Sequence, residues 1–172
     1  MRCLGPGSES AATAVATRPA LRNKPRASPP AETLELVNAA RALHGAPALR
    51  PDPRLARAAR HHSRDMVARR YFEHVSPGGA DLRDRVARTG WLRGRNRWRL
   101  AENLGWGSGS LATPDAIVDA WLNSPDHRRI LLDRGLRVVG IGIEPGTPQG
   151  SPGATYTADF GAAAHLQPGR SR

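Results

Sequence analysis

The sequence predicts an α+β fold in which helices pack on a short antiparallel sheet. Helical patterns fill the first half of the chain, and short strands cluster near its end. The length of 172 residues suits one domain with tails, and a domain of about 130 residues can bury an apolar core without cross-links. This matters because Cys3 is the only cysteine, which excludes an intramolecular disulfide and a cysteine-based zinc site.

The two ends of the chain lack the pattern of a folded domain. Residues 1–30 are rich in Ala, Pro, Ser and Arg without apolar periodicity, so we expect a disordered tail or leader there. Residues 11–16 are too weakly apolar to make a convincing signal peptide. The domain is expected over 31–162, followed by a short tail over 163–172.

Apolar residues at helical spacing, prolines at first helical positions and capping residues predict five helices. Glu32 and Glu35 favour the dipole of the first helix, and Gly45 ends it. Thr113 and Ser124 are the expected N-caps of the last two. The five helices are expected over 32–44, 53–70, 81–89, 114–123 and 125–132.

Extended segments dominate the later part of the chain. Residues 98–106 are extended between glycine-rich flanks, 136–144 alternate apolar residues with glycines, and 154–160 form another short strand. A hairpin-like loop is expected over 146–153, and a plain loop over 47–51. No apolar run approaches the roughly 20 residues that a membrane-spanning helix needs.

The chain is strongly basic, with a formal net charge of +11 and a pI near 11.5. Arginine supplies nearly all of this charge, since Lys24 is the only lysine. Such a charge favours association with polyanions such as wall polymers, anionic lipid or nucleic acid. Scattered arginines, few aromatic residues and the lack of a recognition motif disfavour nucleic acid. We expect a monomer, because nothing in the sequence indicates an oligomer.

Four short motifs follow one another in a specific order. They are HVSPG at 74–78, AENL at 101–104, WLNSPDHR at 121–128, and the late pair VGIG and YTADFG at 139–142 and 156–161. This ordered set, which covers about residues 32–161, resembles the bacterial branch of the CAP superfamily, also called the SCP domain. Three positions depart from that family's pattern: Ala101 and Asp126 replace glycines, and Arg129 replaces an asparagine.

The resemblance implies an α-β-α sandwich with a central cleft, and an extracellular or cell-wall-associated location. Some members of the family bind divalent metal at the cleft histidines, some bind sterols or fatty acids, and others have been proposed as proteases. The resemblance therefore implies no common enzyme activity. The second cleft carboxylate of eukaryotic members has no certain counterpart in this sequence.

His74 and His127 are the candidate metal ligands. Pro77 restricts Ser76 to extended geometry and so stiffens the loop that carries His74. His127 falls in the first turn of the last helix, where the positive helix end favours neutral imidazole, the form that binds metal.

Glu102 is the candidate carboxylate, and it lies in a mostly apolar extended segment. With the two histidines it can form a divalent-ion set completed by water, with zinc as the foremost metal. Alternatively, it hydrogen-bonds a histidine or acts as a general base. Asn103 beside it is interpreted as a residue of the cleft that ties backbone together. His62 lies on the apolar stripe of the second helix and is interpreted as a core histidine, while one of the tryptophans flanking Glu102 could line the cleft.

Three functions remain open at this stage. The first is a non-catalytic extracellular domain whose cleft binds a divalent metal and a lipid or wall-derived ligand. The second is a metal-assisted hydrolase in which Glu102 activates water as the general base. The third is a basic module that adheres to polyanions through its arginines. Whether the chain is an enzyme is not decided by these motifs, and it has no H-E-x-x-H pair.

Overall fold

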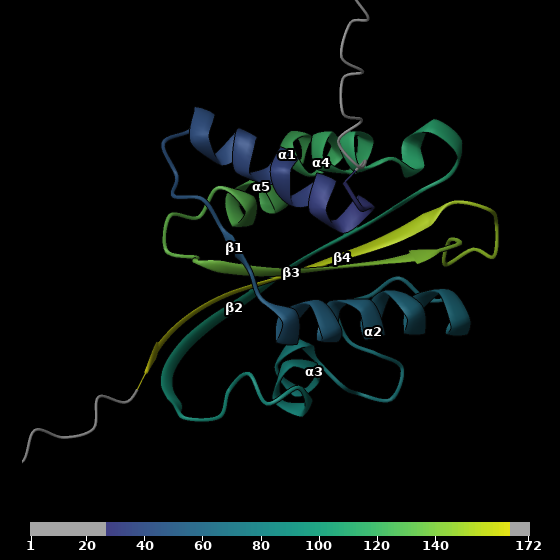
Figure 1. Ribbon diagram of the computed structural model, residues 1–172. Coiled ribbons are helices and arrows are strands. Elements are labelled where there is room, and N and C mark those ends of the chain that lie inside the picture. Colours follow the sequence, from purple (N-terminus) through teal and green to yellow (C-terminus); the bar gives the residue numbers. More distant parts are fainter. Residues whose placement is uncertain (1–26, 166–172) are drawn as a thin grey trace, which may run out of the picture.

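A computed structural model describes residues 27–165, which form a sheet with helices on both faces (Figure 1). Helices α1, α4 and α5 lie on one face, and α2 and α3 lie on the other (Figure 1). The α+β prediction is therefore confirmed. The helices are α1 (Pro29–Leu43), α2 (Pro53–Arg69), α3 (Leu82–Arg88), the short 3-10 turn η1 (Gly109–Ala112), α4 (Pro114–Asn123) and α5 (Pro125–Leu131). The strands are β1 (Arg50–Pro51), β2 (Arg95–Gly107), β3 (Val138–Pro145) and β4 (Ala154–His165).

The strands follow the order β1-β3-β4-β2 across the sheet. The three long strands are antiparallel, as predicted, but the two-residue strand β1 pairs parallel to β3 and makes the sheet mixed. Strand β1 lies inside the segment 47–51 that was expected to be a loop. Because Pro51 has no N–H, the bonds come from its neighbours: the Arg50 N–H donates to Arg137 and the Asp52 N–H to Val139. A pairing this short leaves no alternating pattern in the sequence.

The expected helix boundaries shift by a few residues. Helix α1 begins at Pro29 rather than at 32, since proline fits the first helical position. Strand β4 runs to His165, past the expected domain end at 162. The parts of the two expected tails over 1–26 and 166–172 lie outside the described residues. None of the helices within 27–165 is long and apolar enough to cross a membrane.

The face of the sheet under α1, α4 and α5 carries the larger apolar core. Alternate side chains of β3 and β4 point into it. Trp121 of α4 is 2% exposed there, as predicted for a core residue, and its indole N–H donates to the Leu104 carbonyl at 2.8 Å. The largest fully buried side chains of this core are Val37, Trp121, Leu131, Leu136, Tyr156 and Phe160.

The opposite face is flatter because β3 presents glycines to α2. A Cβ at Gly140 or Gly142 would collide with the backbone of α2 at Ala56 or Arg60. The glycines that alternate along this strand therefore let a helix backbone rest directly on the sheet. A second, smaller apolar cluster beside this contact consists of Leu55, Ala58, Val86 and Trp91.

Candidate functional site

Strand β2 forms an edge of the sheet, and its residues Glu102 and Asn103 hold the two candidate histidines. Consecutive strand residues point to opposite faces. Glu102 Oε1 lies 2.7 Å from Nδ1 of His74 on one side. On the other side, the Asn103 side-chain amide donates to the His127 carbonyl at 3.1 Å. One edge strand thus positions both histidine segments, and Asn103 ties backbone as expected.

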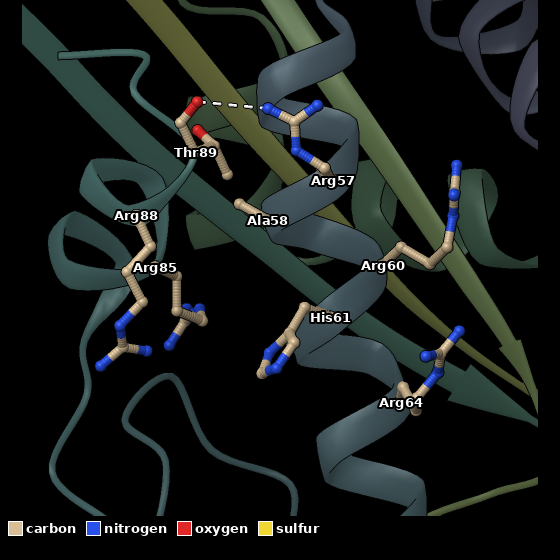
Figure 2. Close-up of a pocket in the computed structure, with 8 residues that line it drawn as sticks. All are labelled: Arg57, Ala58, Arg60, His61, Arg64, Arg85, Arg88 and Thr89. Carbon is tan, nitrogen blue, oxygen red and sulfur yellow. Dashed lines mark hydrogen bonds between the residues drawn. The ribbon is translucent and has the colours of Figure 1, made fainter. Parts of the chain in front are cut away.

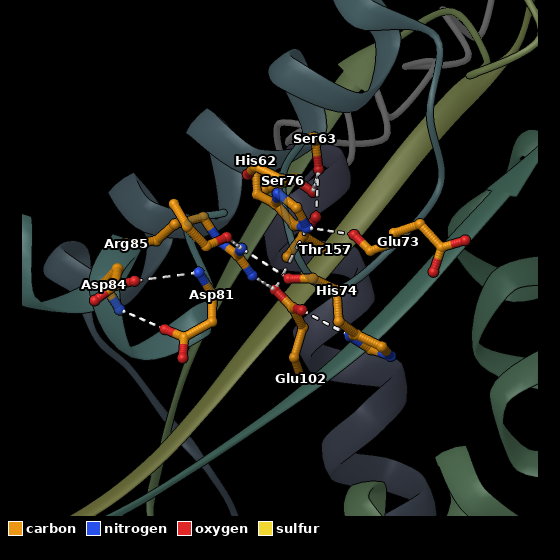
Figure 3. Close-up of polar contacts among 12 residues, drawn as sticks. His62, Ser63, Glu73, His74, Ser76, Asp81, Asp84, Arg85, Glu102 and Thr157 are labelled. Carbon is orange, nitrogen blue, oxygen red and sulfur yellow. Dashed lines mark hydrogen bonds and ion pairs between the residues drawn. The ribbon is translucent and has the colours of Figure 1, made fainter. Parts of the chain in front are cut away.

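Glu102 is a buried anion with both oxygens engaged (Figure 3). Its side chain is 3% exposed, and Arg85 Nη2 donates to Oε2 at 2.6 Å. Burial alone would raise the pKa of this carboxyl, but the hydrogen bond from His74 and the charge of Arg85 outweigh it and lower the pKa. Glu102 is therefore ionised at neutral pH.

Arg85 of α3 connects Glu102 to the loop that carries His74. Its Nη1 donates to the carbonyls of His74 at 2.9 Å and Ala80 at 3.1 Å. The residue is only 3% exposed. The sequence did not predict this role, because an arginine on a short helix usually faces solvent. Its neighbour Val86 on the buried side is the only local signal that could have suggested it.

Asp159 is a second carboxyl beside Glu102, and no motif had predicted a role for it. The two residues are paired across β2 and β4, so their side chains share one face of the sheet. Asp159 is fully buried. Burial and the charge on Glu102 raise the pKa of Asp159 well above its usual range. The signal available was its position in the YTADFG motif.

His62 is a satisfied core histidine, as predicted. It has no exposed surface, and its Nε2 lies 3.0 Å from the Glu73 carbonyl, to which it must donate. Burial lowers the pKa of His62 to about 4, so the ring is neutral. Its Nε2 also lies 4.0 Å from Glu102 Oε2, which places it at the margin of the same polar cluster.

His127 is half-buried at the start of α5. Nδ1 of His127 lies 3.0 Å from the Ser124 hydroxyl. The Ser124 side chain therefore contacts the imidazole ring and makes no capping hydrogen bond to the backbone of α5. Ser124 was expected as an N-cap, and it stands at that position with its oxygen committed elsewhere. Burial and then the positive charge of His74 lower the pKa of His127. Neutral imidazole is the form that results.

Each histidine opens into its own groove. The His74 groove, of about 400 Å³, is walled by Val75, Leu82, Trp98 and Leu100 and reaches Glu102. The His127 groove, of about 280 Å³, is walled by residues that include Phe72, Leu104, Trp106 and Trp121. Trp98 and Trp106, which flank Glu102 along β2, therefore each line a groove, whereas only one of the two tryptophans was expected to do so. The polar residues of the lining are His74, Asp81, Arg83 and Glu102 in the first groove, and Ser124 and His127 in the second.

The two histidines are the donors that a cation could use. Both Glu102 oxygens are committed to His74 and Arg85, so this carboxylate supports a ring instead of offering a free ligand atom. Within residues 27–165, no group of three or more His, Cys, Asp or Glu side chains is arranged to hold a metal ion. A cation held here would take two protein ligands and complete its shell from water or a bound molecule.

Residues 34–160 match the family described as CAP, the cysteine-rich secretory protein family. The chain belongs to this family. The match begins within α1 and ends within β4, and it contains His74, Glu102, Asn103 and His127. The CAP match thus covers both histidine grooves and all of the sheet except the last five residues of β4.

Two Bacillus subtilis proteins are similar to this CAP domain in sequence. YkwD is 32% identical over 117 residues, which is 67% of this chain and 43% of YkwD. The membrane protein YlbC is 33% identical over 114 residues, which is 66% of this chain and 31% of YlbC. The chain therefore spans less than half the length of these relatives.

Solved structures share the CAP fold. An extracellular protein of Bacillus anthracis that contains an SCP domain aligns with a TM-score of 0.63 and 30% identity, covering 75% of this chain and 38% of that protein. An outer surface protein of Borrelia burgdorferi aligns with a TM-score of 0.63 and 21% identity, covering 76% of this chain and 90% of that protein. The second likeness concerns the fold alone.

Proposed function

We propose that this CAP domain acts outside the cell and binds a divalent cation, zinc first, through Nε2 of His74 and Nε2 of His127. One observation carries the proposal. In both histidines Nδ1 is held by an internal partner, Glu102 at 2.7 Å and Ser124 at 3.0 Å, so Nε2 is the nitrogen left for a ligand. The extracellular part rests on the similarity to an extracellular Bacillus anthracis protein.

Glu102 has an orienting role in this proposal. The His74 Nδ1–H donates to the Glu102 carboxylate, which fixes the ring and makes Nε2 a better electron donor. Arg85 keeps the carboxylate ionised and in place. The Asn103 side-chain amide donates a hydrogen bond to the His127 carbonyl and so fixes the backbone at His127. The chain thus holds both rings in fixed positions before any ligand arrives.

The ligand class follows from the walls of the two grooves. A molecule bound at the histidines would place a polar group between apolar surfaces that carry Trp98 on one side and Trp106 on the other. A lipid with a polar head, or a wall-derived ligand with apolar substituents, has this combination. When bound, a divalent cation would supply positive charge for the polar group.

In the hydrolase alternative, the candidate catalytic residue becomes His74 instead of Glu102. Glu102 has both oxygens engaged and 3% exposure, which disfavours it as a base acting on a water molecule. His74 is the exposed member of the pair, with 59% of its side chain accessible. The hydrogen bond with Glu102 raises the pKa of His74, which suits a proton carrier. We place this alternative second because nothing in the described grooves identifies a scissile bond.

Zinc titration by calorimetry tests the proposal. We expect His74→Ala and His127→Ala each to weaken zinc binding by more than tenfold, or about 1.4 kcal/mol. His61→Ala is the matched control, because His61 is an exposed histidine on α2 that touches neither ligand. The proposal fails if the wild type binds no zinc, or if His61→Ala weakens binding as much as the two cleft variants.

A further inference from the structure

A third groove, which we call the arginine groove, lies between α2 and α3 and has a volume of about 360 Å³. Figure 2 shows His61 on the side of α2 that faces α3, with Arg85 and Arg88 across from it. Five arginines line the groove, and no Asp or Glu is among its lining residues within the described part of the chain. The full lining is Arg57, Ala58, Arg60, His61, Arg64, Arg85, Arg88 and Thr89.

Most of this positive charge has no counter-charge in the fold. Arg85 pairs with Glu102, and Arg64 lies 3.8 Å from Glu144. The other three arginines, Arg57, Arg60 and Arg88, form no ion pair with any residue over 27–165. Like charges gathered around a concave surface repel one another and focus a positive potential into it. An anion bound in the groove would relieve that repulsion.

The spacing of the arginines suits several phosphates in a row. Arg57, Arg60 and Arg64 stand on the exposed side of α2 and extend along about 10 Å of helix. Arg88 lies across the groove on α3, while the Arg60 and Arg64 side chains extend from α2 away from α3 (Figure 2). A guanidinium presents a planar fork that binds phosphate oxygens in pairs. A single phosphate group would contact only part of such a row.

The lining also limits what else the ligand contains. It has no aromatic side chain besides the His61 ring, and its one aliphatic residue, Ala58, is 3% exposed. Nucleic acid single strands need aromatic platforms for their bases, and membrane-surface binding needs apolar side chains that enter the bilayer. We propose that the arginine groove binds a phosphodiester polymer with an aliphatic polyol or sugar backbone, at a site separate from the histidine grooves.

The test measures binding of a short glycerol phosphate oligomer to the full chain by calorimetry at several salt concentrations. The groove variant is Arg60→Gln with Arg88→Gln. The control is Arg50→Gln with Arg134→Gln, which removes the same two charges from exposed residues that line none of the grooves. We expect the groove variant to weaken binding at least about tenfold and to reduce the salt slope by about two, and the control to change affinity less than about threefold.

Three outcomes would overturn the proposal. Equal losses in the two double variants would mean that net charge alone attracts the polymer. Tighter binding to phosphatidylglycerol vesicles, or to single-stranded DNA of matched charge, would identify a membrane or a nucleic acid as the partner. Loss of oligomer binding in His74→Ala would place the polymer in the histidine grooves. Zinc affinity of the groove variant, expected to be unchanged, separates this result from a failure of the proposed metal site.

Discussion

The two faces of the sheet are stabilised by different physics. Beneath α1, α4 and α5 the core is apolar, and its buried Arg41 donates to the carbonyls of Pro47, Leu131 and Asp133 without a carboxylate partner in contact. Beneath α2 and α3 the apolar cluster is small, and a buried ion pair of Arg85 and Glu102 lies beside it. Burial of apolar area is non-directional, whereas a buried ion pair fails when one partner is lost. We therefore expect substitutions on the face covered by α2 and α3 to lower the free energy of unfolding more than substitutions on the other face.

The largest expected effect comes from breaking the buried ion pair. Arg85→Met leaves Glu102 buried without its counter-charge, so we expect a loss of about 3–5 kcal/mol in the free energy of unfolding. Urea denaturation followed by tryptophan fluorescence measures this loss. Arg88→Met, on the exposed side of the same helix, should cost about 0.5 kcal/mol or less.

A double variant sharpens this prediction. Glu102→Gln combined with Arg85→Met removes the buried charge that has lost its partner. The double variant should therefore lose less free energy of unfolding than the sum of the losses in the two single variants. Strict additivity would mean that the two side chains do not depend on each other. A loss in Arg85→Met no greater than in Arg88→Met would contradict the comparison of the two faces.

A glycine on the α2 side tests how closely the two layers pack. Gly140→Ala places a Cβ against the backbone of α2 at Ala56, which cannot move as a side chain does. We expect a loss near the upper end of the overpacking range, about 3 kcal/mol, in thermal or urea unfolding. Ile141→Val, one residue along and on the opposite face, should cost only about 0.5–1.5 kcal/mol. Equal losses would show that α2 adjusts its position freely.

The smallest of these effects is a dependence on pH through His62. Its pKa of about 4 lies below the ordinary value of 6.5, so the unfolded chain binds a proton that the folded chain does not. Stability therefore rises with pH between about 4 and 6.5 and is lost on acidification. The contribution lost between pH 7 and pH 5 is about 2 kcal/mol.

A comparison of variants isolates that contribution. His62→Gln keeps a donor for the Glu73 carbonyl but removes the titration, so its stability should fall less between pH 7 and pH 5 than that of the wild type. His61→Gln, the neighbouring exposed histidine, should keep the wild-type slope. An unchanged slope in His62→Gln would mean that other groups carry the acid sensitivity.

The sequence predicted the regular elements well, because apolar periodicity, prolines and caps are local signals. Strand β1 escaped prediction, since two residues carry no alternation. The motifs led to His74, Glu102 and His127, but not to the partners of Glu102. Arg85 lies 17 residues before Glu102 on α3, and Asp159 lies opposite Glu102 on the neighbouring strand β4. No local sequence pattern marks such contacts. Charge placement also escaped it: the arginines are scattered along the sequence, yet five of them line one groove.

Strand β2 pairs with β4 without interruption from Arg97 to Gly107, after an irregularity between Arg95 and Arg97. Beyond that irregularity the pairing fixes which face each β2 side chain occupies. A chain that closed this strand one residue out of step would turn Glu102 and Asn103 to the wrong faces together. His74 and His127 would then lose their supports in a single event. A misregistered molecule would keep its apolar layers and still lack the whole site, so binding at the histidines would report whether β2 had paired with β4 in the correct register.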